Sequence, residues 1–379
     1  MFSAKSTRAG EIGNEVELCL VAGARPNFVK IAPILRALGV AGLSERGLIQ
    51  TRLVHTGQHY DHGMSQSFFD DLGIRVPDAN LGCGSGSQAE VTGAIMVAFE
   101  RELREHPADL VLVVGDVNST MACSIVAKKM GSQLAHVEAG IRSGDMSMPE
   151  EINRIVTDSL ADIFYTPSRG ANENLRRAGV PEEKIVFVGN VMIDSLVGNL
   201  ERLKRPDVWE QAGLESGGYL VLTMHRPATV DDPSRVQGLL EVICGQTDLP
   251  VVFPVHPRTR DKLGNASERF ANLILVPPLG YLEFIYLVRG ARGVVSDSGG
   301  ISEETTYLDV PCITLRTNTE RPETVTQGTN RLVGHDRSAI REAMIDLLAG
   351  DWPRARIPEK WDGRAAARIA EHLEALANG

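Results

Sequence analysis

Three acidic residues stand at successive corners between elements that the sequence predicts. Asp116 follows a strand-like apolar run, Glu138 follows the next extended segment, and Glu150 lies in the first turn of the next predicted helix. Clustered carboxylates repel one another, which raises the pKa of at least one and separates acid from base roles. Each residue also has a structural alternative: a helix cap for Asp116, an ion pair of Glu138 with Arg142, and a favourable helix dipole for Glu150. We expect the three carboxylates to converge.

Cationic residues stand at further corners of the same kind. Arg25 lies between the first predicted strand and its helix, where a guanidinium and the amide groups of a helix start can hold a phosphate together. In the second half, His225 and Arg226 follow one strand, and His256 and Arg258 follow the next. An imidazole beside a guanidinium suits a diphosphate. The alternative is an ordinary turn with exposed cationic side chains.

The segment Asp297-Ser-Gly-Gly300 carries the sharpest local signal. A strand ends there, a turn of small residues permits a ligand to approach the backbone, and a helix begins. We expect a phosphate on the amide groups of Ser298, Gly299 and Gly300. Glu304, about one turn further on, could accept hydrogen bonds from ribose hydroxyls. The alternative is a capped helix whose acidic residues favour its dipole.

Several familiar motifs are absent from the sequence. It contains no GxxxxGK[ST], HExxH, GxSxG or CxxC, which argues against a P-loop kinase, a zincin and a typical serine hydrolase. The first strand–helix turn lacks GxGxxG, so a tightly bound nicotinamide is not supported. The glycine-rich stretch 82–86 follows no clear strand and is interpreted as a flexible loop. We expect neither a cofactor nor a bound metal.

Short apolar segments alternate with amphipathic ones along the chain. Strands are predicted at 16–22, 47–54, 110–114, 133–137, 163–166 and 185–188, and then at 219–224, 251–255, 274–276, 293–296 and 312–315. Helical patterns lie between them, and one begins with the capping-box pattern Ser87-x-x-Glu90. Two successive runs of βα units indicate an α/β protein with two doubly wound, parallel-sheet domains. We expect the domains at 1–193 and 194–363, with the polar stretch 201–218 as a candidate junction and a helix at 364–379.

The composition excludes several classes of protein. The chain has 379 residues, of which 43% are hydrophobic and 23% charged, as in soluble globular proteins. Its net charge of −10 and the absence of a basic run argue against nucleic-acid binding. The 5 cysteines form no pair, which favours a reducing compartment. We find no secretory signal and no apolar run of the roughly 20 residues that span a membrane, so we expect a cytoplasmic protein without a membrane partner.

Taken together, the corner segments resemble a known family. In order, they are Gly23-Ala-Arg-Pro-Asn-Phe-Val-Lys30, His55-Thr-Gly-Gln-His59, Gly115-Asp116, His136-Val-Glu-Ala-Gly-Ile-Arg142, Pro149-Glu-Glu-Ile-Asn-Arg154, His225-Arg226, Asp297-Ser-Gly-Gly-Ile-Ser-Glu-Glu304 and Thr319-Glu-Arg-Pro-Glu323. Each motif alone is weak, but the ordered set, from about Val16 to Val333, resembles the non-hydrolysing UDP-N-acetylglucosamine 2-epimerases of bacteria.

The resemblance implies the GT-B architecture, in which two Rossmann-like domains face each other across the active-site cleft and the terminal helix crosses back onto the first domain. It implies that UDP-GlcNAc and UDP-ManNAc are interconverted without a metal or an external cofactor. Removal of the C2 proton and anti elimination of UDP would give 2-acetamidoglucal, to which UDP adds again with C2 inverted. The family also implies a homodimer, a UDP-sugar and UDP as partners, and a place in polysaccharide biosynthesis.

The resemblance also implies roles for individual residues. Asp116, Glu138 and Glu150 match carboxylates implicated in the acid and base steps, with no assignment of each proton. His225, counted with the catalytic residues, could stabilise the leaving diphosphate together with Arg25. The other binding positions that match the family are Glu304 at the ribose, Phe284 against the uracil, and the charged residues Lys30, Arg142, Arg154 and Arg321.

The chain departs from the family pattern at three places. Val117 replaces a frequent Thr, the segment 225–228 reads His-Arg-Pro-Ala instead of His-Arg-Arg-Glu, and 59–61 reads His-Tyr-Asp. The last two segments match positions near an activator site of some bacterial members, so we expect no activation by UDP-GlcNAc. They also resemble relatives that act on UDP-diacetamido uronates. The alternatives are an epimerase of such a sugar, a hydrolysing epimerase, a GT-B glycosyltransferase and a sensor of nucleotide sugars.

Overall fold

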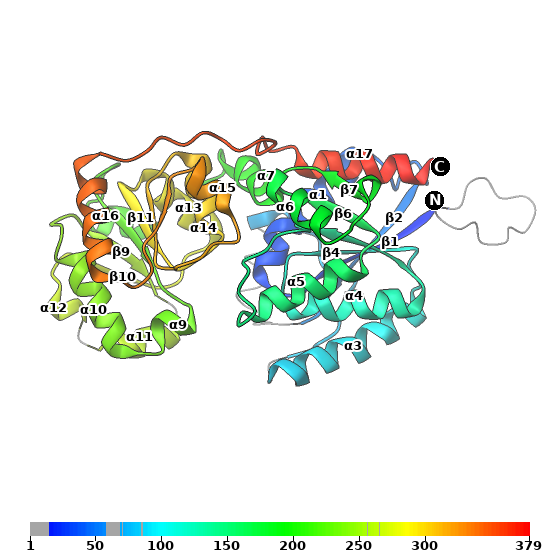
Figure 1. Cartoon of the computed structure of the whole chain (residues 1–379), viewed down its shortest axis with the longest axis horizontal. Helices are drawn as coiled ribbons and strands as arrows, with labels where there is room; N and C mark the ends of the chain where they lie inside the picture. Colours follow the sequence, from blue (N-terminus) through cyan, green and yellow to red (C-terminus); the bar gives the residue numbers. More distant parts are fainter. Residues whose placement is uncertain (1–14, 58–68, 70, 85, 256, 265) are drawn as a thin grey trace, which may run out of the picture. The chain divides into compact units, whose positions relative to one another are not determined.

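The computed structural model describes residues 15–57, 69, 71–84, 86–255, 257–264 and 266–379, with the backbone alone at 25, 227, 228, 257, 258, 261 and 267. The chain forms two compact units: unit 1 is Met1–Gly198 with Glu359–Gly379, and unit 2 is Asn199–Pro358 (Figure 1). The predicted boundaries after residues 193 and 363 lie inside α7 (Val191–Asn199) and just before α17 (Ala365–Ala377). The stretch 201–218 belongs to unit 2.

Unit 1 is built on a seven-stranded sheet with the order β3-β2-β1-β4-β5-β6-β7, and all its strand pairs are parallel. The strands are β1 (Val16–Ala22), β2 (Ile49–His55), β3 (Ala79–Asn80), β4 (Leu110–Val114), β5 (Gln133–Val137), β6 (Ile163–Thr166) and β7 (Ile185–Phe187). The sequence LVLVV of β4 is buried at every position. Such continuous apolar runs are typical of central parallel strands, because helices cover both faces of the sheet.

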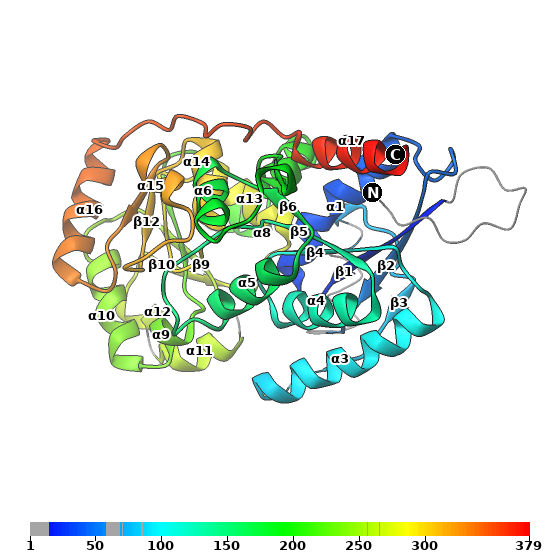
Figure 2. The same cartoon turned by 45° about the vertical axis from the view of Figure 1, so that its right-hand side comes forward.

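The helices of unit 1 lie on both faces of this sheet. They are α1 (Arg25–Val40), α3 (Gln88–Glu105), α4 (Asn118–Met130), α5 (Pro149–Leu160), α6 (Arg169–Arg177), the 3₁₀ helix η1 (Glu182–Lys184), α7 and α17. Helices α3, α4 and α5 pack side by side on one face, and α17 packs against α1 on the other (Figures 1 and 2). The predicted capping box is confirmed, because the Ser87 and Glu90 side chains each accept the backbone N–H of the other residue.

Unit 2 repeats the design with a six-stranded parallel sheet of order β10-β9-β8-β11-β12-β13. Its strands are β8 (Leu220–Thr223), β9 (Val251–Pro254), β10 (Leu273–Val276), β11 (Gly293–Ser296), β12 (Cys312–Thr314) and β13 (Asn330–Leu332). Its helices are α8 (Asp207–Gln211), α9 (Pro227–Val230), α10 (Pro233–Cys244), α11 (Pro257–Leu263), α12 (Ala266–Arg269), α13 (Tyr281–Gly290), α14 (Ile301–Leu308), α15 (Pro322–Thr326) and α16 (Arg337–Ala349). The prediction of two doubly wound parallel sheets is confirmed.

The strand order of each sheet reverses beside its first strand. In unit 1 the chain proceeds from β1 outward to β2 and β3 and then places β4 on the other side of β1, and in unit 2 strand β8 lies between β9 and β11. Ligands of open α/β sheets bind at the carboxyl ends of the strands at such a reversal. Gly115 and Asp116 leave β4 at this point of unit 1, and His225 and Asp297 follow β8 and β11 at the equivalent point of unit 2. The topology thus selects the same corners as the sequence.

Two short strands, β3 and β13, were not among the predicted ones. Each has three residues or fewer and includes a polar residue, Asn80 or Asn330, so neither shows an apolar run that would predict a strand. Among the described residues, no helix combines the length and apolar character that crossing a bilayer requires. In the same part of the chain, no group of three or more His, Cys, Asp or Glu residues is arranged to hold a metal ion.

Candidate active site

The corner after β4 requires a glycine. Gly115 has φ +71°, and a Cβ atom there would lie 3.2 Å from both Glu138 Oε2 and Lys30 Nζ. The Asn27 side chain holds the neighbouring β1–α1 corner in place, because it accepts the amide N–H groups of Gly23 and Ala24 and donates to the carbonyl oxygen that ends β4. The two corners are therefore joined by a side chain at the start of α1.

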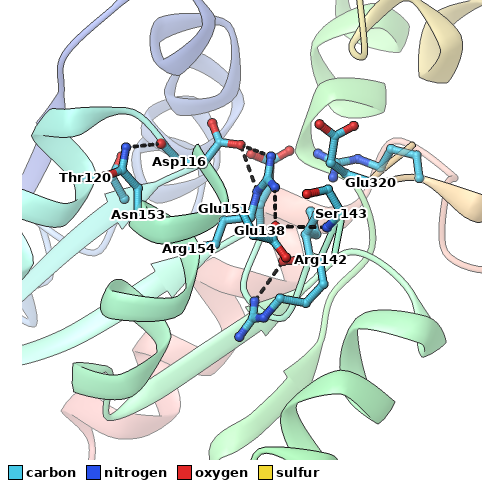
Figure 3. Close-up of polar contacts among 12 residues, drawn as sticks. Asp116, Thr120, Glu138, Arg142, Ser143, Glu151, Asn153, Arg154 and Glu320 are labelled. Carbon is cyan, nitrogen blue, oxygen red and sulfur yellow. Dashed lines mark hydrogen bonds and ion pairs between the residues drawn. The ribbon is translucent and has the colours of Figure 1, made fainter. Parts of the chain in front are cut away.

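Arg154 joins two carboxylates from different elements (Figure 3). Its Nε and Nη2 atoms lie 3.0 and 2.5 Å from Asp116 Oδ2, and its Nη1 atom lies 2.7 Å from Glu151 Oε2. Asn153, the preceding residue on α5, donates to the backbone oxygen of Asp116 at 2.8 Å. The side chain of Arg154 is only 5% exposed, whereas that of Asp116 is 29% exposed. Asp116 is thus held by a buried cation and remains accessible to a ligand.

Glu151 anchors the loop between β5 and α5. Its two carboxylate oxygens accept the amide N–H groups of Ser143 and Gly144 at 2.9 and 3.0 Å, in addition to the contact with Arg154. Burial by itself would raise the pKa of Glu151, but these hydrogen bonds and the guanidinium outweigh it and leave the pKa below its usual value. Glu151 is therefore an ionised residue whose oxygens already have donors.

Glu138 adopts a strained backbone conformation beside this cluster. It has φ +70°, in the left-handed region that residues other than glycine rarely occupy. Its buried carboxylate forms an ion pair with Lys30 of α1. Strand β5 ends at Val137, so Glu138 follows the strand as predicted, but its backbone has already left the extended conformation.

The alternative ion pair between Glu138 and Arg142 does not form. Arg142 Nη1 instead lies 2.6 Å from Asp158 Oδ2 on α5. Glu150 precedes the anchored Glu151 on the first turn of α5, and its side chain is partly exposed. Within the described residues the structure shows neither a hydrogen bond nor an ion pair for Glu150. Asp116 and Glu138 thus lie at neighbouring corners, each with a cation, and Glu150 directly precedes the anchored Glu151 in the first turn of α5.

In unit 2 a buried carboxylate holds the corner after β8. Asp297, at the end of β11, accepts the amide N–H groups of His225 and Arg226 at 2.9–3.1 Å. Its Oδ1 atom also lies 2.9 Å from His225 Nδ1. Burial would raise the pKa of Asp297, but His225 and the two amide groups lower it below the usual range. The His225 side chain is 57% exposed, although its Nδ1 atom is held by Asp297.

The small-residue turn after Asp297 differs in one respect from the prediction. The amide of Ser298 already donates to Ser296 Oγ at 2.9 Å, whereas no hydrogen bond is shown for the amides of Gly299 and Gly300 in the described part of the chain. A Cβ atom on Gly299 would lie 3.1 Å from Arg316 Nη1. Arg316 is buried and forms two hydrogen bonds of 2.9 Å with Glu320. The buried ion pair of Arg316 and Glu320 therefore packs against this turn at Gly299.

Glu304 carries an unusual carboxyl group one turn into α14. Burial raises its pKa to about 8, and the nearby Tyr281 hydroxyl opposes this shift only in part. The Tyr281 hydroxyl lies near this carboxyl group but not in hydrogen-bond geometry, and neither it nor Glu304 Oε1 has another partner among the described residues. A buried, unsatisfied acceptor is costly, and such a group is suited to a ligand that supplies hydroxyl donors.

The remaining predicted positions are spread over unit 2 and α1. Phe284 is partly buried on α13 and packs against an apolar cluster of unit 2. Arg321 forms an ion pair with the buried Glu303. His256 lies outside the described residues, and so do the side chains of Arg25 and Arg258, although the backbone of Arg25 begins α1.

Sequence reasoning missed several residues that organise these corners. Glu151, Asp158 and Asn153 all lie on the buried side of α5, yet the sequence does not reveal which side of a polar helix is buried. Asp297 stands inside a motif that the sequence singles out, but its hydrogen bonds to the next corner depend on the pairing of β8 with β11. Arg316 lies shortly after β12. Its position at the end of a strand is the feature by which the sequence could have indicated it.

The chain is similar to a known family and to several of its members. Residues 41–374 match the family model described as UDP-N-acetylglucosamine 2-epimerase. The UDP-N-acetylglucosamine 2-epimerase of Methanocaldococcus jannaschii is 39% identical over 345 residues, which cover 88% of this chain and 92% of that protein. The UDP-2,3-diacetamido-2,3-dideoxy-D-glucuronate 2-epimerase of Pseudomonas aeruginosa is 38% identical over 95% of this chain and 100% of that protein.

Solved structures agree with these relatives. The M. jannaschii epimerase in complex with UDP-GlcNAc and UDP superimposes with a TM-score of 0.85 at 36% identity, over 95% of this chain and 99% of that one. A glycosyltransferase of kitacinnamycin, at 11% identity and a TM-score of 0.56, shares the fold alone. These likenesses and the two parallel sheets identify the GT-B fold. The family model and the identity to curated relatives show that the chain belongs to the UDP-N-acetylglucosamine 2-epimerase family.

Proposed function

We propose that the chain is a non-hydrolysing 2-epimerase that interconverts UDP-GlcNAc and UDP-ManNAc. The observation that carries this proposal is the pairing of two carboxylates with cations at the carboxyl edge of one sheet, Asp116 with Arg154 and Glu138 with Lys30. The M. jannaschii relative is named for the epimerase activity, and its structure contains UDP-GlcNAc and UDP. The family membership supports the same reaction here.

The proposed reaction breaks two bonds of the sugar and then forms them again. A carboxylate removes the C2 proton while the bond between C1 and the UDP oxygen breaks on the opposite face, which leaves 2-acetamidoglucal and UDP. UDP then adds to C1, and a proton returns to the other face of C2. The C2 hydrogen is weakly acidic, so its removal must accompany the departure of UDP. A positioned base typically contributes about 10²–10⁴-fold to such a step.

We assign the proton transfers to Asp116, Glu138 and Glu150. Glu151 is left out of this group because its oxygens are already bound by backbone and guanidinium N–H groups. We give it a positioning role instead, since it holds Arg154, which in turn holds Asp116. The carboxylates of Asp116 and Glu138 are each paired with a cation at this edge, and the side chain of Glu150 is partly exposed.

We assign the binding of UDP to the carboxyl edge of unit 2. The amides of Gly299 and Gly300 can donate to a phosphate, and the exposed imidazole of His225 can add a donor or a positive charge. The unsatisfied Glu304 can accept hydrogen bonds from the ribose hydroxyls. Stabilisation of a leaving diphosphate by such fixed donors lowers the barrier to C1–O cleavage. Phe284 supplies an aromatic surface for the uracil.

A second substrate has specific support. The P. aeruginosa relative, which is named for a UDP-diacetamido-glucuronate, is as similar to this chain as the M. jannaschii epimerase is. A panel that contains UDP-GlcNAc, UDP-ManNAc and UDP-2,3-diacetamido-2,3-dideoxy-D-glucuronate distinguishes the two. Turnover of the uronate alone would retain the reaction type and overturn the proposed substrate.

The decisive experiment follows C2 in deuterated water. The protein is incubated with UDP-GlcNAc, and the sugar products are identified by NMR. We expect UDP-ManNAc with deuterium at C2 and deuterium in the recovered UDP-GlcNAc as well. Accumulation of free ManNAc and UDP would indicate a hydrolysing enzyme. Epimerisation without any C2 exchange would contradict the proposed elimination.

Amide variants test the three carboxylates. We expect Asp116→Asn, Glu138→Gln and Glu150→Gln each to lower kcat at least about 10²-fold. Glu183→Gln is the matched control, because Glu183 is exposed in unit 1 and takes no part in this edge. Near-normal turnover in all three variants would favour a glycosyltransferase, which does not need these groups.

A further inference from the structure

His136 forms two hydrogen bonds inside unit 1. The residue lies on β5, and its side chain is completely buried. Its Nδ1 atom lies 2.7 Å from Asp158 Oδ1 on α5, and its Nε2 atom lies 2.9 Å from the carbonyl oxygen of Gly115. The imidazole therefore connects α5 with the corner that follows β4. That corner carries Asp116, one of the proposed acid–base residues.

Both partners of the ring are hydrogen-bond acceptors. A carbonyl oxygen cannot donate, so Nε2 must carry a hydrogen to make its contact with Gly115. The other partner, Asp158, accepts the amide N–H of Gly140 at 3.1 Å and a guanidinium N–H of Arg142 at 2.6 Å, both at Oδ2. A carboxyl group beside a guanidinium is held in its ionised form.

The pKa of Asp158 supports the same view. Burial would raise it, but His136 and Arg142 outweigh burial and leave the pKa below its usual value. An ionised Asp158 can only accept, so Nδ1 of the ring must donate as well. The neighbours of His136 across the sheet are the apolar residues Val113 and Phe164. The charged groups that the structure shows in this network are therefore Asp158 and Arg142.

We propose that His136 is a positioning residue that carries a hydrogen on both ring nitrogens and thereby fixes the Gly115 carbonyl, which directs Asp116 out of β4. The amide of Gly115 donates to the backbone oxygen of Val137 at 3.0 Å, so both sides of this glycine are held by β5. Loss of the bond from His136 would free the carbonyl to rotate. The corner would then no longer present Asp116 in one direction.

The state of the ring can be observed directly. Nitrogen-15 NMR of selectively labelled histidine distinguishes a ring with two N–H groups from either neutral form. The chain has 9 histidines, and the His136 signals are assigned by their absence in His136→Gln. We expect both nitrogens of His136 to carry a hydrogen in the folded protein at neutral pH, since both ring nitrogens face acceptors. A neutral ring, with a hydrogen on only one nitrogen, would overturn the proposal.

Asp158→Asn provides a second, opposite test. An asparagine keeps an acceptor for Gly140 and Arg142 and can turn its NH₂ group toward the ring. His136 Nδ1 then becomes the acceptor, and we expect a neutral ring with its hydrogen on Nε2, still bound to Gly115. If the spectrum of His136 does not change in this variant, the ring was not paired with an ionised carboxylate and the proposal fails.

Kinetics test the positioning role, and this part rests on the proposed function. His136→Gln can bind Gly115 or Asp158 but not both, so we expect kcat to fall about 10- to 100-fold with little change in KM, in line with a small misplacement of a reacting group. His106→Gln, an exposed histidine of unit 1, is the control. Asp158→Asn retains the bond to Gly115 and should lose less activity than His136→Gln.

The outcomes separate the two proposals. If the wild-type protein epimerises no UDP-sugar, the proposed function fails while the NMR result still decides the state of the ring. If the wild type is active and His136→Gln retains full kcat with normal thermal stability, the positioning role is wrong. The positioning role would also be contradicted if Asp158→Asn lost as much kcat and as much thermal stability as His136→Gln does.

Discussion

At the scale of single residues, Glu304 makes two properties of the protein depend on pH. Its pKa is about 8 in the folded chain, against 4.5 for an ordinary glutamate. The folded state therefore holds this proton more tightly than the unfolded state does. The stability that comes from the neutral group is full below about pH 4.5 and is lost as the pH rises through 8.

Replacement of Glu304 by glutamine should remove this dependence. At pH 9 we expect Glu304→Gln to be more stable than the wild type by a few kcal/mol, because it has no buried charge to accommodate. At pH 5 the two proteins should unfold alike. Circular dichroism during thermal unfolding measures the difference, and Glu268→Gln, exposed in the same unit, should match the wild type at both pH values. A wild type more stable than Glu304→Gln at pH 9 would contradict the burial of this charge.

The same carboxyl group should link UDP binding to pH. If ribose hydroxyls donate to the ionised form, binding releases a proton, and the affinity for UDP should rise about tenfold between pH 7 and pH 9. The affinity of Glu304→Gln should change less over this range, because it has no such proton. Isothermal titration calorimetry at both pH values gives the change in UDP affinity with pH for the wild type and for Glu304→Gln. Equal changes in the two proteins would show that UDP does not engage Glu304.

The sequence indicates some of these residues better than others. Asp116 and Glu138 could be predicted because each follows a recognisable buried strand. The choice between Glu150 and Glu151 as the anchored residue could not, since both occupy the first turn of one helix. The pKa of Glu304 could not be predicted either, because it depends on how completely α14 is covered.

At the scale of elements, Gly115 and Gly131 make a matched pair. Both have a positive φ, at +71° and +89°, but a Cβ atom would meet Glu138 and Lys30 at Gly115 and nothing within 4 Å at Gly131. We expect Gly131→Ala to cost about 1 kcal/mol of stability and to retain full activity. Gly115→Ala should cost a similar amount of stability and lose at least about 10²-fold in kcat, because it displaces the carboxylate of Glu138.

Thermal unfolding and initial rates of epimerisation test this pair. Wild-type kcat in Gly115→Ala would show that the close approach of this glycine to the carboxylate has no bearing on the reaction. A loss of activity in Gly131→Ala as large as in Gly115→Ala would show that backbone strain alone, and not contact with Glu138, is responsible.

Helix α5 shows that hydrophobic periodicity does not always predict which side of a helix is buried. Its buried side consists of polar residues, among them Glu151, Arg154 and Asp158, whereas Ile152 and Ile155 are 43% and 38% exposed. A hydrophobic pattern would place the helix the other way round. The existence and the first turn of α5 could be predicted, but its orientation could not, because ion pairs of its buried polar residues with neighbouring corners favour the observed side.

At the scale of the whole molecule, α17 belongs to unit 1 although it follows unit 2 along the chain. Asp194 of α7 accepts the amide N–H groups of Ala365 and Ala366 at 3.1 and 2.6 Å and so caps the start of α17. Alternating βα units predicted the two sheets. The placement of α17 was implied only by resemblance, because an amphipathic stripe does not identify the surface it covers. The homodimer expected from the family stays a prediction.

Removal of this cap should affect one unit only. We expect Asp194→Ala to destabilise unit 1 by about 1–3 kcal/mol, since two buried N–H groups lose their acceptor. Hydrogen exchange measured by mass spectrometry should show faster exchange in α1 and α17 and unchanged exchange in unit 2. Asp336→Ala, which removes the cap of α16 in unit 2, is the reciprocal control. If either variant speeds exchange equally in both units, the prediction that each cap stabilises only its own unit is wrong.

The path of the chain has a consequence for biosynthesis. Because unit 2 is inserted between α7 and α17, a ribosome must translate all of unit 2 before the helix that covers α1 emerges. Nascent unit 1 therefore exposes the apolar side of α1 while some 160 further residues are made. During that interval it is open to chaperones and to wrong partners, whereas unit 2, which is continuous, can fold as soon as it leaves the exit tunnel.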